Sequence, residues 1–320
     1  SSKEFMMIGH ARCGMALSRS ASLLTSQKTI KQSFSGVRSI LSLNHLDVEK
    51  LTQRKFSQGI STRVISTPDA SPSPSIGQLV ASLAEKFPNM DVLRYDHKNV
   101  KWSFKHIDHY ADCVAIGLLE QGLQPGDAML SWLPKHFCEQ HVLQLACSKA
   151  GFILYELDPS QAINDKEGAK KALKKALEDT EATCLFSQEA GDSVNYVQLC
   201  REVIPEIRIF DFQKGMPFFT PRFPNLRFPI HTGFEMNGKE GMLALKHLVV
   251  PSGEMNNLLG DVKISGETPL RGELKIGSDG LPMKGAILSN NGVIKAQIWP
   301  EISAMIEKKY TEVEGVGVVF

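Results

Sequence analysis

The sequence lacks a strong charge of either sign and has no long hydrophobic run. Its 320 residues include 36 lysines and arginines and 35 aspartates and glutamates, which give a formal net charge of +1. No apolar stretch approaches the roughly 18–20 residues that cross a bilayer, and balanced charge gives no general argument for nucleic-acid binding. At 42% hydrophobic residues the composition is ordinary for a globular protein. These features exclude an integral helical membrane protein, a collagen-like chain and a wholly disordered chain, and the length allows about two domains.

The sequence also lacks the short motifs of several chemistries. It has no Gly-x-Ser-x-Gly elbow of the hydrolase type. His106 and His109 are one helical turn apart, but no third ligand is evident, so we expect an exposed helix face and no metal site. Six cysteines form no CxxC pair and match no zinc spacing, which predicts reduced, mostly buried thiols in a non-secreted protein. They are Cys13, Cys113, Cys138, Cys147, Cys184 and Cys200.

Residues 1–56 have the composition of a mitochondrial targeting segment. Between Phe5 and Leu46 the chain has five basic residues, no acidic residue and frequent serine. A basic, serine-rich and acid-poor start is typical of a transit peptide, and Arg54-Lys55-Phe56-Ser57 resembles a matrix processing site. A basic arm that binds an acidic surface is the alternative. Residues 57–75 follow as a Pro/Ser linker, because prolines among small polar residues disfavour helix and sheet.

From Ile76 onward, helical and strand-like apolar patterns alternate along the chain. Strand, helix, strand and helix in succession predict an α/β fold with parallel βαβ units. We expect an α/β subdomain over residues 76–210 and a second part over 211–320. The expected helices are Ile76–Phe87, Phe104–Gln121, Phe137–Ala150, Asp165–Asp179 and Asn291–Lys309, the last broken or kinked by Pro300. The expected strands are Asp91–Tyr95, Lys101–Ser103, Ala128–Leu133, Phe152–Leu157, Thr183–Ser187 and a β-like tail, Glu312–Phe320.

Two segments are unusual in composition. Met216–Pro229 interleaves four phenylalanines with prolines and two arginines. We expect no regular structure there, and the aromatic side chains must either cover a core or dock on another protein, which is the favoured interpretation. The helix Asp165–Asp179 contains five lysines, which predict a solvated face, with contact to anionic lipid or an acidic partner as the alternative.

Several short motifs follow one another along the chain after the linker. Phe-Pro closes the first helix, Gly122-Leu123-Gln124-Pro125-Gly126-Asp127 forms a turn, Leu-Pro ends a strand, Ala150-Gly151 ends a helix, and Asp158-Pro159 ends the next strand. This series resembles the N-terminal half of the adenylate-forming acyl-CoA synthetase (AMP-dependent synthetase/ligase) superfamily. The resemblance runs from about Ile76 to Ile294, and it implies a partial acyl-CoA synthetase N-terminal domain.

In this family a loop rich in Ser, Thr and Gly and followed by Pro-Lys-Gly handles the phosphates of ATP. The matching residues here would be Gly277, Ser278, Gly280, Lys284 and Gly285. Small residues allow backbone N–H groups to approach an anion, and a cation completes the shell.

The loop departs from the family pattern at several positions. Lys275 and Ile276 replace hydroxyl residues, and Asp279 replaces threonine. Met283 is inserted between proline and lysine, and Asn290 replaces a histidine. We therefore interpret the segment as a degenerate phosphate loop without ATP, and we expect no cofactor.

The family's later motifs, including its catalytic lysine, would lie beyond Phe320, so we expect no catalytic residue in this chain. The sequence predicts a catalytically inactive pseudoenzyme that serves as a structural or accessory subunit of a mitochondrial assembly. An inner-membrane respiratory complex or ATP synthase is the expected assembly. We expect other protein subunits as partners, no nucleic acid, no transmembrane helix, and a place in the matrix or on the matrix face of the inner membrane. The alternatives are a nucleotide- or acyl-CoA-binding regulatory module, or half of a split acyl-CoA ligase.

Overall fold

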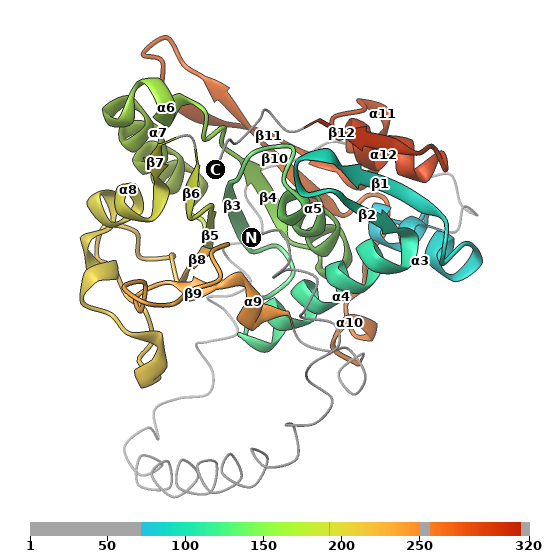
Figure 1. Cartoon of the computed structure of the whole chain (residues 1–320), viewed down its shortest axis with the longest axis horizontal. Helices are drawn as coiled ribbons and strands as arrows, with labels where there is room; N and C mark the ends of the chain where they lie inside the picture. Colours follow the sequence, from blue (N-terminus) through green and yellow to red (C-terminus); the bar gives the residue numbers. More distant parts are fainter. Residues whose placement is uncertain (1–71, 192, 250–256, 315–320) are drawn as a thin grey trace, which may run out of the picture. The chain divides into compact units, whose positions relative to one another are not determined.

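The computed structural model describes residues 72–191, 193–249 and 257–314 (Figure 1). The predicted targeting segment 1–56, most of the linker and the end of the predicted tail lie outside these residues. Within the described residues, no helix is both long enough and apolar enough to cross a membrane.

A seven-stranded sheet forms the centre of the fold, in the order β11-β10-β4-β3-β5-β8-β9. All neighbouring strands are parallel except β10 and β11, which form an antiparallel hairpin at one edge. The predicted α/β fold with parallel βαβ units is therefore confirmed. The strands are β3 (Ala128–Trp132), β4 (Ile153–Glu156), β5 (Cys184–Ser187), β8 (Phe228–His231), β9 (Leu243–Ala244), β10 (Pro269–Ile276) and β11 (Pro282–Ser289).

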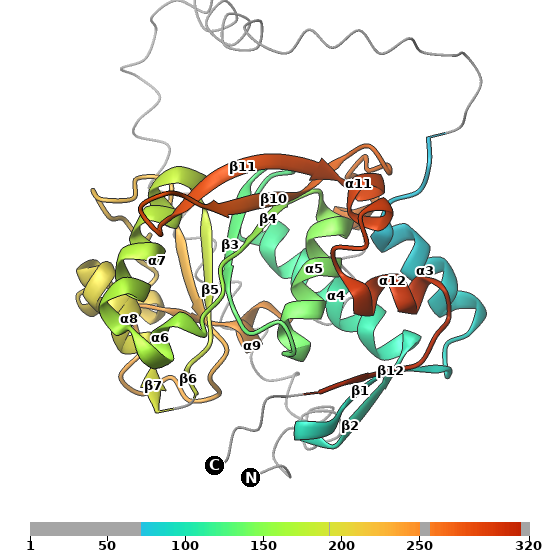
Figure 2. The same cartoon turned by 90° about the horizontal axis from the view of Figure 1, so that it is seen from above.

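Helices cover both faces of this sheet (Figure 2). Along β3, Met129 packs into one core cluster with the first three helices, while Leu130 packs into a second cluster with the later two. This alternation follows from the period of two along a strand. The first three helices are α3 (Ile76–Lys86), α4 (Phe104–Glu120) and α5 (Cys138–Ala150), and the later two are α7 (Lys166–Thr180) and α8 (Tyr196–Val203).

Capping residues in the local sequence account for the helix ends. Ser75 caps α3, and its side chain accepts a hydrogen bond from the Gln78 N–H at 3.2 Å. Asp165 caps α7 in the same way, through the Gly168 N–H at 2.8 Å. Gly151 ends α5 with a φ of 75°, which favours glycine. The predicted boundaries of these helices are confirmed to within about two residues.

A small three-stranded sheet and short helices complete the fold. β1 (Asp91–Tyr95) lies between β2 (Val100–Ser103), its antiparallel hairpin partner, and β12 (Thr311–Val313), which is parallel to it. The break predicted at Pro300 is confirmed, because it separates α11 (Asn290–Lys295) from α12 (Pro300–Ile306). The other elements are η2 (Asp96–Lys98), α6 (Gln161–Asn164), β6 (Ala190–Gly191), β7 (Val194–Asn195), η3 (Pro205–Arg208), η4 (Phe212–Lys214), α9 (Leu245–Leu248) and α10 (Asn257–Gly260).

The prediction that Met216–Pro229 lacks regular structure was wrong at its end, since β8 begins at Phe228. The Phe228 N–H donates to the Thr183 carbonyl on the β5 side. The backbone nitrogen of the next residue, Pro229, therefore faces the β9 side. Pairing with β9 begins only at Ile230, so the missing N–H of Pro229 leaves no strand hydrogen bond unmade. Phe218 and Phe223 are buried in the second core cluster, so part of this segment covers a core.

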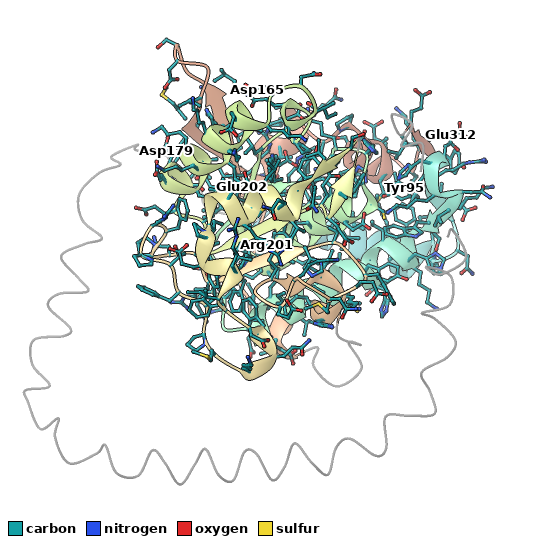
Figure 3. All side chains as sticks on the ribbon, turned by 60° about the vertical axis from the view of Figure 1, so that its left-hand side comes forward. Tyr95, Asp165, Asp179, Arg201, Glu202 and Glu312 are labelled. Carbon is teal, nitrogen blue, oxygen red and sulfur yellow. The ribbon has the colours of Figure 1, made fainter. Side chains whose placement is uncertain are left out.

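The lysine-rich helix α7 has a solvated outer face, as predicted. Lys175 pairs with Asp179 at 2.7 Å, and Lys170 pairs with Glu202 of α8 at 2.9 Å and with Glu167. Figure 3 shows Asp165 and Asp179 at the two ends of α7 and Glu202 on the neighbouring helix. These ion pairs compensate much of the positive charge of the helix.

Candidate functional site

The predicted phosphate loop forms the tip of the β10–β11 hairpin. Because β10 is parallel to β4 and extends past the end of β4, the tip lies beyond the carboxyl edge of the sheet. That edge is where ligands bind in open α/β sheets. The loop residues Gly277, Ser278 and Gly280 are thus placed together at an edge suited to a site.

The backbone of the loop is hydrogen-bonded to itself. The Gly277 N–H donates to the Leu281 carbonyl at 2.8 Å, and the Gly280 N–H donates to the Gly277 carbonyl at 3.1 Å. The Leu281 N–H donates to Asp279 Oδ1 at 3.1 Å. Three of the five amides over residues 277–281 are therefore used inside the turn. A phosphate cradle needs such amides directed at the anion.

The inserted methionine leaves the pairing of the hairpin regular next to its tip. Met283 pairs in regular register with Lys275. The extra residue is absorbed farther along β11, where Gly285 and Ala286 together face Glu273 as a β-bulge. A Cβ at Gly285 would lie 3.1 Å from the Cβ of Glu273, so the close approach of the strands favours glycine at this position.

Lys284 lies away from the loop amides. Its Nζ lies 5.8 Å from the centre of the Tyr155 ring. It lines a cavity of about 460 Å³ that also includes Asp127, Glu181 and Arg227, and no residue of 277–281 contributes to the lining. The structure therefore brings Gly277, Ser278 and Gly280 together at the hairpin tip, whereas Lys284 and Gly285 lie within β11.

The cavity was missed by motif reasoning. Its lining comes from the turn before β3, from β4, from the carboxyl end of α7 and from the segment before β8, in addition to β11. The turn around Asp127 is one of the motifs that carry the family resemblance, but its placement at the same cavity as Arg227 depends on strand order. Only the tertiary fold brings these charged residues to one cavity.

His106 and His109 are exposed on α4, as predicted. His106 Nδ1 accepts a hydrogen bond from the Ser103 N–H at 3.2 Å, so this side chain belongs to the helix cap. In the described part of the chain, no three His, Cys, Asp or Glu side chains are grouped so as to hold a metal ion.

A partly buried carboxylate, Glu156, organises the carboxyl end of β4. It accepts hydrogen bonds from Gln140 Nε2 at 2.6 Å, Gln144 Nε2 at 2.8 Å, Arg271 Nε at 3.1 Å and Trp299 Nε1 at 3.1 Å. Each carboxylate oxygen accepts at least two of these bonds. Because the partners lie up to 143 residues away, no local signal in the sequence identifies this network.

Comparison with known proteins agrees with this architecture. Residues 80–214 match the family model described as AMP-binding enzyme. The mitochondrial medium-chain acyl-CoA ligase of Rattus norvegicus is 25% identical over 226 residues, which cover 69% of this chain and 34% of that protein. The Homo sapiens ligase of the same name is 25% identical over 295 residues, which cover 90% of this chain and 45% of that protein. The chain thus spans between a third and a half of the length of these relatives.

Solved structures share the fold at low sequence identity. Acetoacetyl-CoA synthetase from Streptomyces lividans aligns with a TM-score of 0.54 and 17% identity, covering 74% of this chain and 38% of that one. MbtA from Mycobacterium smegmatis aligns with a TM-score of 0.54 and 15% identity, covering 76% of this chain and 44% of that one. Residues 80–214 are therefore an AMP-binding enzyme domain, and the chain is homologous to acyl-CoA ligases over 69–90% of its length.

Proposed function

We propose that this chain is a catalytically inactive acyl-CoA synthetase-like protein that serves as a structural or accessory subunit of a mitochondrial assembly. The expected assembly is an inner-membrane respiratory complex or ATP synthase. One observation carries the proposed loss of activity: three of the five amides of the phosphate loop are bonded within the turn, while Lys284 lies in a separate cavity. The mitochondrial relatives and the transit-peptide-like composition of residues 1–56 support the location.

Electrostatics of the loop support the same proposal. Asp279 is exposed at the tip, and its carboxylate accepts a hydrogen bond from the Leu281 N–H. A carboxylate about 4 Å from a phosphate charge is unfavourable by about 1 kcal/mol in water and by about 4 kcal/mol at an effective dielectric of 20. Adenylation requires positive groups preorganised at developing negative charge. This loop presents the opposite sign.

A ligand titration tests the loss of nucleotide binding. A ligand at a hundred times its Kd stabilises the folded state by about 2.7 kcal/mol. We expect millimolar ATP with magnesium to leave the thermal midpoint of the full chain unchanged. The variant Lys284→Ala should respond in the same way as the natural chain. A stabilisation by ATP that is lost in Lys284→Ala would contradict this part of the proposal.

The accessory role has its own test. Native electrophoresis of solubilised mitochondria, followed by mass spectrometry of the band that contains this chain, should place it in a large membrane complex. The same spectra identify the complex and report which part of residues 1–56 it retains. A chain that migrates only as a free monomer would overturn the accessory role.

The cavity beside Lys284 favours one alternative function, a regulatory module that binds a nucleotide or acyl-CoA. Lys284 and Arg227 supply cations for phosphate or carboxylate groups, although Asp127 and Glu181 oppose them. Stabilisation of the chain by AMP or acyl-CoA that disappears in both Lys284→Ala and Arg227→Ala would favour this alternative. The exposed Lys171→Ala on α7 is the matched control for loss of one positive charge.

A further inference from the structure

An exposed apolar surface lies between α8 and β8, in the segment that contains η3 and η4. Its large apolar side chains are Ile209, Met216 and Phe219, which are 80%, 56% and 58% exposed. We call these three residues, together with Arg208, Lys214 and Arg222, the 209–219 patch. Figure 1 shows this yellow segment at the lower left of the drawn fold, away from the edge hairpin β10–β11.

Contacts on the inner side hold the patch in place. The Phe210 and Phe218 rings lie 5.1 Å apart, and Arg222 Nε lies 3.8 Å from Glu206 Oε1. These two contacts bring residues 206–210 alongside residues 218–222, which places Ile209 and Phe219 on adjoining stretches of chain. Phe218 is buried in the core beneath them. An anchored segment therefore holds these apolar side chains in an exposed position. They can be buried only by contact with another surface.

In the ion pairs of the patch, the cationic side chains are more exposed than the carboxylates. In the pair Arg222–Glu206 the arginine side chain is 56% exposed and the glutamate 18%. In the pair Lys214–Asp211 the lysine is 73% exposed and the aspartate 22%. Arg208 is exposed as well. In both pairs the cation is the more exposed partner, so the outer surface of the patch combines apolar and cationic side chains.

We propose that the 209–219 patch docks this protein on a membrane surface that contains anionic lipids. Apolar side chains that enter the boundary between headgroups and acyl chains, flanked by cations that face anionic headgroups, are the two components of peripheral membrane binding. A protruding set of separate apolar side chains suits a deformable lipid interface, whereas protein partners favour packed pockets around a central anchor. This inference goes beyond the accessory role, and it does not depend on membership of a complex.

Binding of the full chain to vesicles tests the proposal. The probes are phosphatidylcholine vesicles with and without about a third of phosphatidylglycerol. We expect binding to the anionic vesicles and weaker binding to the neutral ones, since each interfacial cation contributes about 1 kcal/mol. The double variant Ile209→Ser/Phe219→Ser should bind at least about tenfold more weakly, because burial of one such side chain is worth about 1.5–3 kcal/mol. Ile276→Ser is the matched control, since Ile276 is 69% exposed on β10 outside the patch.

A second readout separates the patch from the basic segment 1–56, which all these variants share. A fluorophore is attached at Met216→Cys or, as control, at Met283→Cys, with Cys13 replaced by serine; the five described cysteines are buried. We expect a blue shift on anionic vesicles at position 216 and none at 283. Equal vesicle binding by the double variant, or no shift at 216, would overturn the proposal. A shift at 216 with membrane-free mitochondrial extract and none with vesicles would overturn it in favour of a protein partner.

Discussion

Replacement of Glu156 by alanine should destabilise the fold strongly, because this carboxylate is the shared acceptor of three buried donors. Gln140, Gln144 and Trp299 are all buried, and each donates a hydrogen bond to Glu156. Arg271, on β10, forms an ion pair with Glu156 in which the Nε–Oε2 distance is 3.1 Å. The alanine variant leaves these donors without their acceptor and leaves a cavity where the carboxylate was.

The size of the effect follows from the number of donors. A buried donor without a partner destabilises a fold by about 1–3 kcal/mol, and three buried donors lose their acceptor here. Some donors will regain partners by relaxation, so we expect a loss of about 3–5 kcal/mol in the free energy of unfolding. Glu156→Gln retains one acceptor oxygen but turns an NH₂ group towards other donors, so its loss should be about 1–3 kcal/mol.

Urea unfolding of the full chain, followed by tryptophan fluorescence and far-ultraviolet circular dichroism, measures these changes. Glu178→Ala is the control, because Glu178 is exposed and its ion pair with Lys174 is long, at 3.8 Å. An exposed pair of this kind contributes at most about 0.5 kcal/mol. If Glu156→Ala changes the free energy of unfolding no more than Glu178→Ala does, the network does not hold these elements together and the reasoning is refuted.

Three further predictions concern other buried positions. Burial and the nearby Lys239 lower the pKa of His231 to about 4. The unfolded chain therefore binds the proton more tightly, and the free energy of unfolding should fall as the pH drops from about 6.5 to 4. In His231→Gln, the urea midpoint measured over this pH range should change less. Gly272→Ala would place its Cβ 2.0 Å from the Tyr155 ring and should destabilise by about 2–4 kcal/mol, whereas Gly260→Ala meets no atom within 4 Å and should change the midpoint little. Burial raises the pKa of Cys200 to about 12, and a pulse of iodoacetamide at neutral pH should modify the five described cysteines only after unfolding, as mass spectrometry can verify.

Local signals in the sequence predicted the elements around residues 76–187 well. Caps such as Ser75 and Asp165, and the stop at Gly151, act within one turn of chain and can be read without the fold. The strand β8 was harder, because Pro229 disfavours a strand unless its missing N–H faces an unpaired side. That condition depends on where β9 begins, which is a property of the sheet.

Long-range contacts set the limit for the candidate site. The predicted phosphate loop is a local segment, and the structure places two of its glycines, Gly277 and Gly280, at one hairpin tip. The cavity with Lys284, Asp127 and Arg227, in contrast, depends on the order of the strands from β11 to β8 in the sheet. Similarly, the Phe/Pro segment showed an excess of aromatic residues, but only packing decides that Phe218 points inward and Phe219 outward.

The glycines of the hairpin are explained by its geometry and need no nucleotide. Gly280 has a φ of 74°, which a turn of this form requires of its residue. Gly285 faces Glu273 at a bulge with little room for a side chain. Both positions would favour glycine in a hairpin that never contacts phosphate, so their presence carries no information about ATP. Lys284 does distinguish a structural role from nucleotide binding, because neither the turn nor the bulge requires a cation at this position. A test of nucleotide binding should therefore vary Lys284 and leave the glycines intact, since a glycine variant would change the hairpin whether or not a ligand binds.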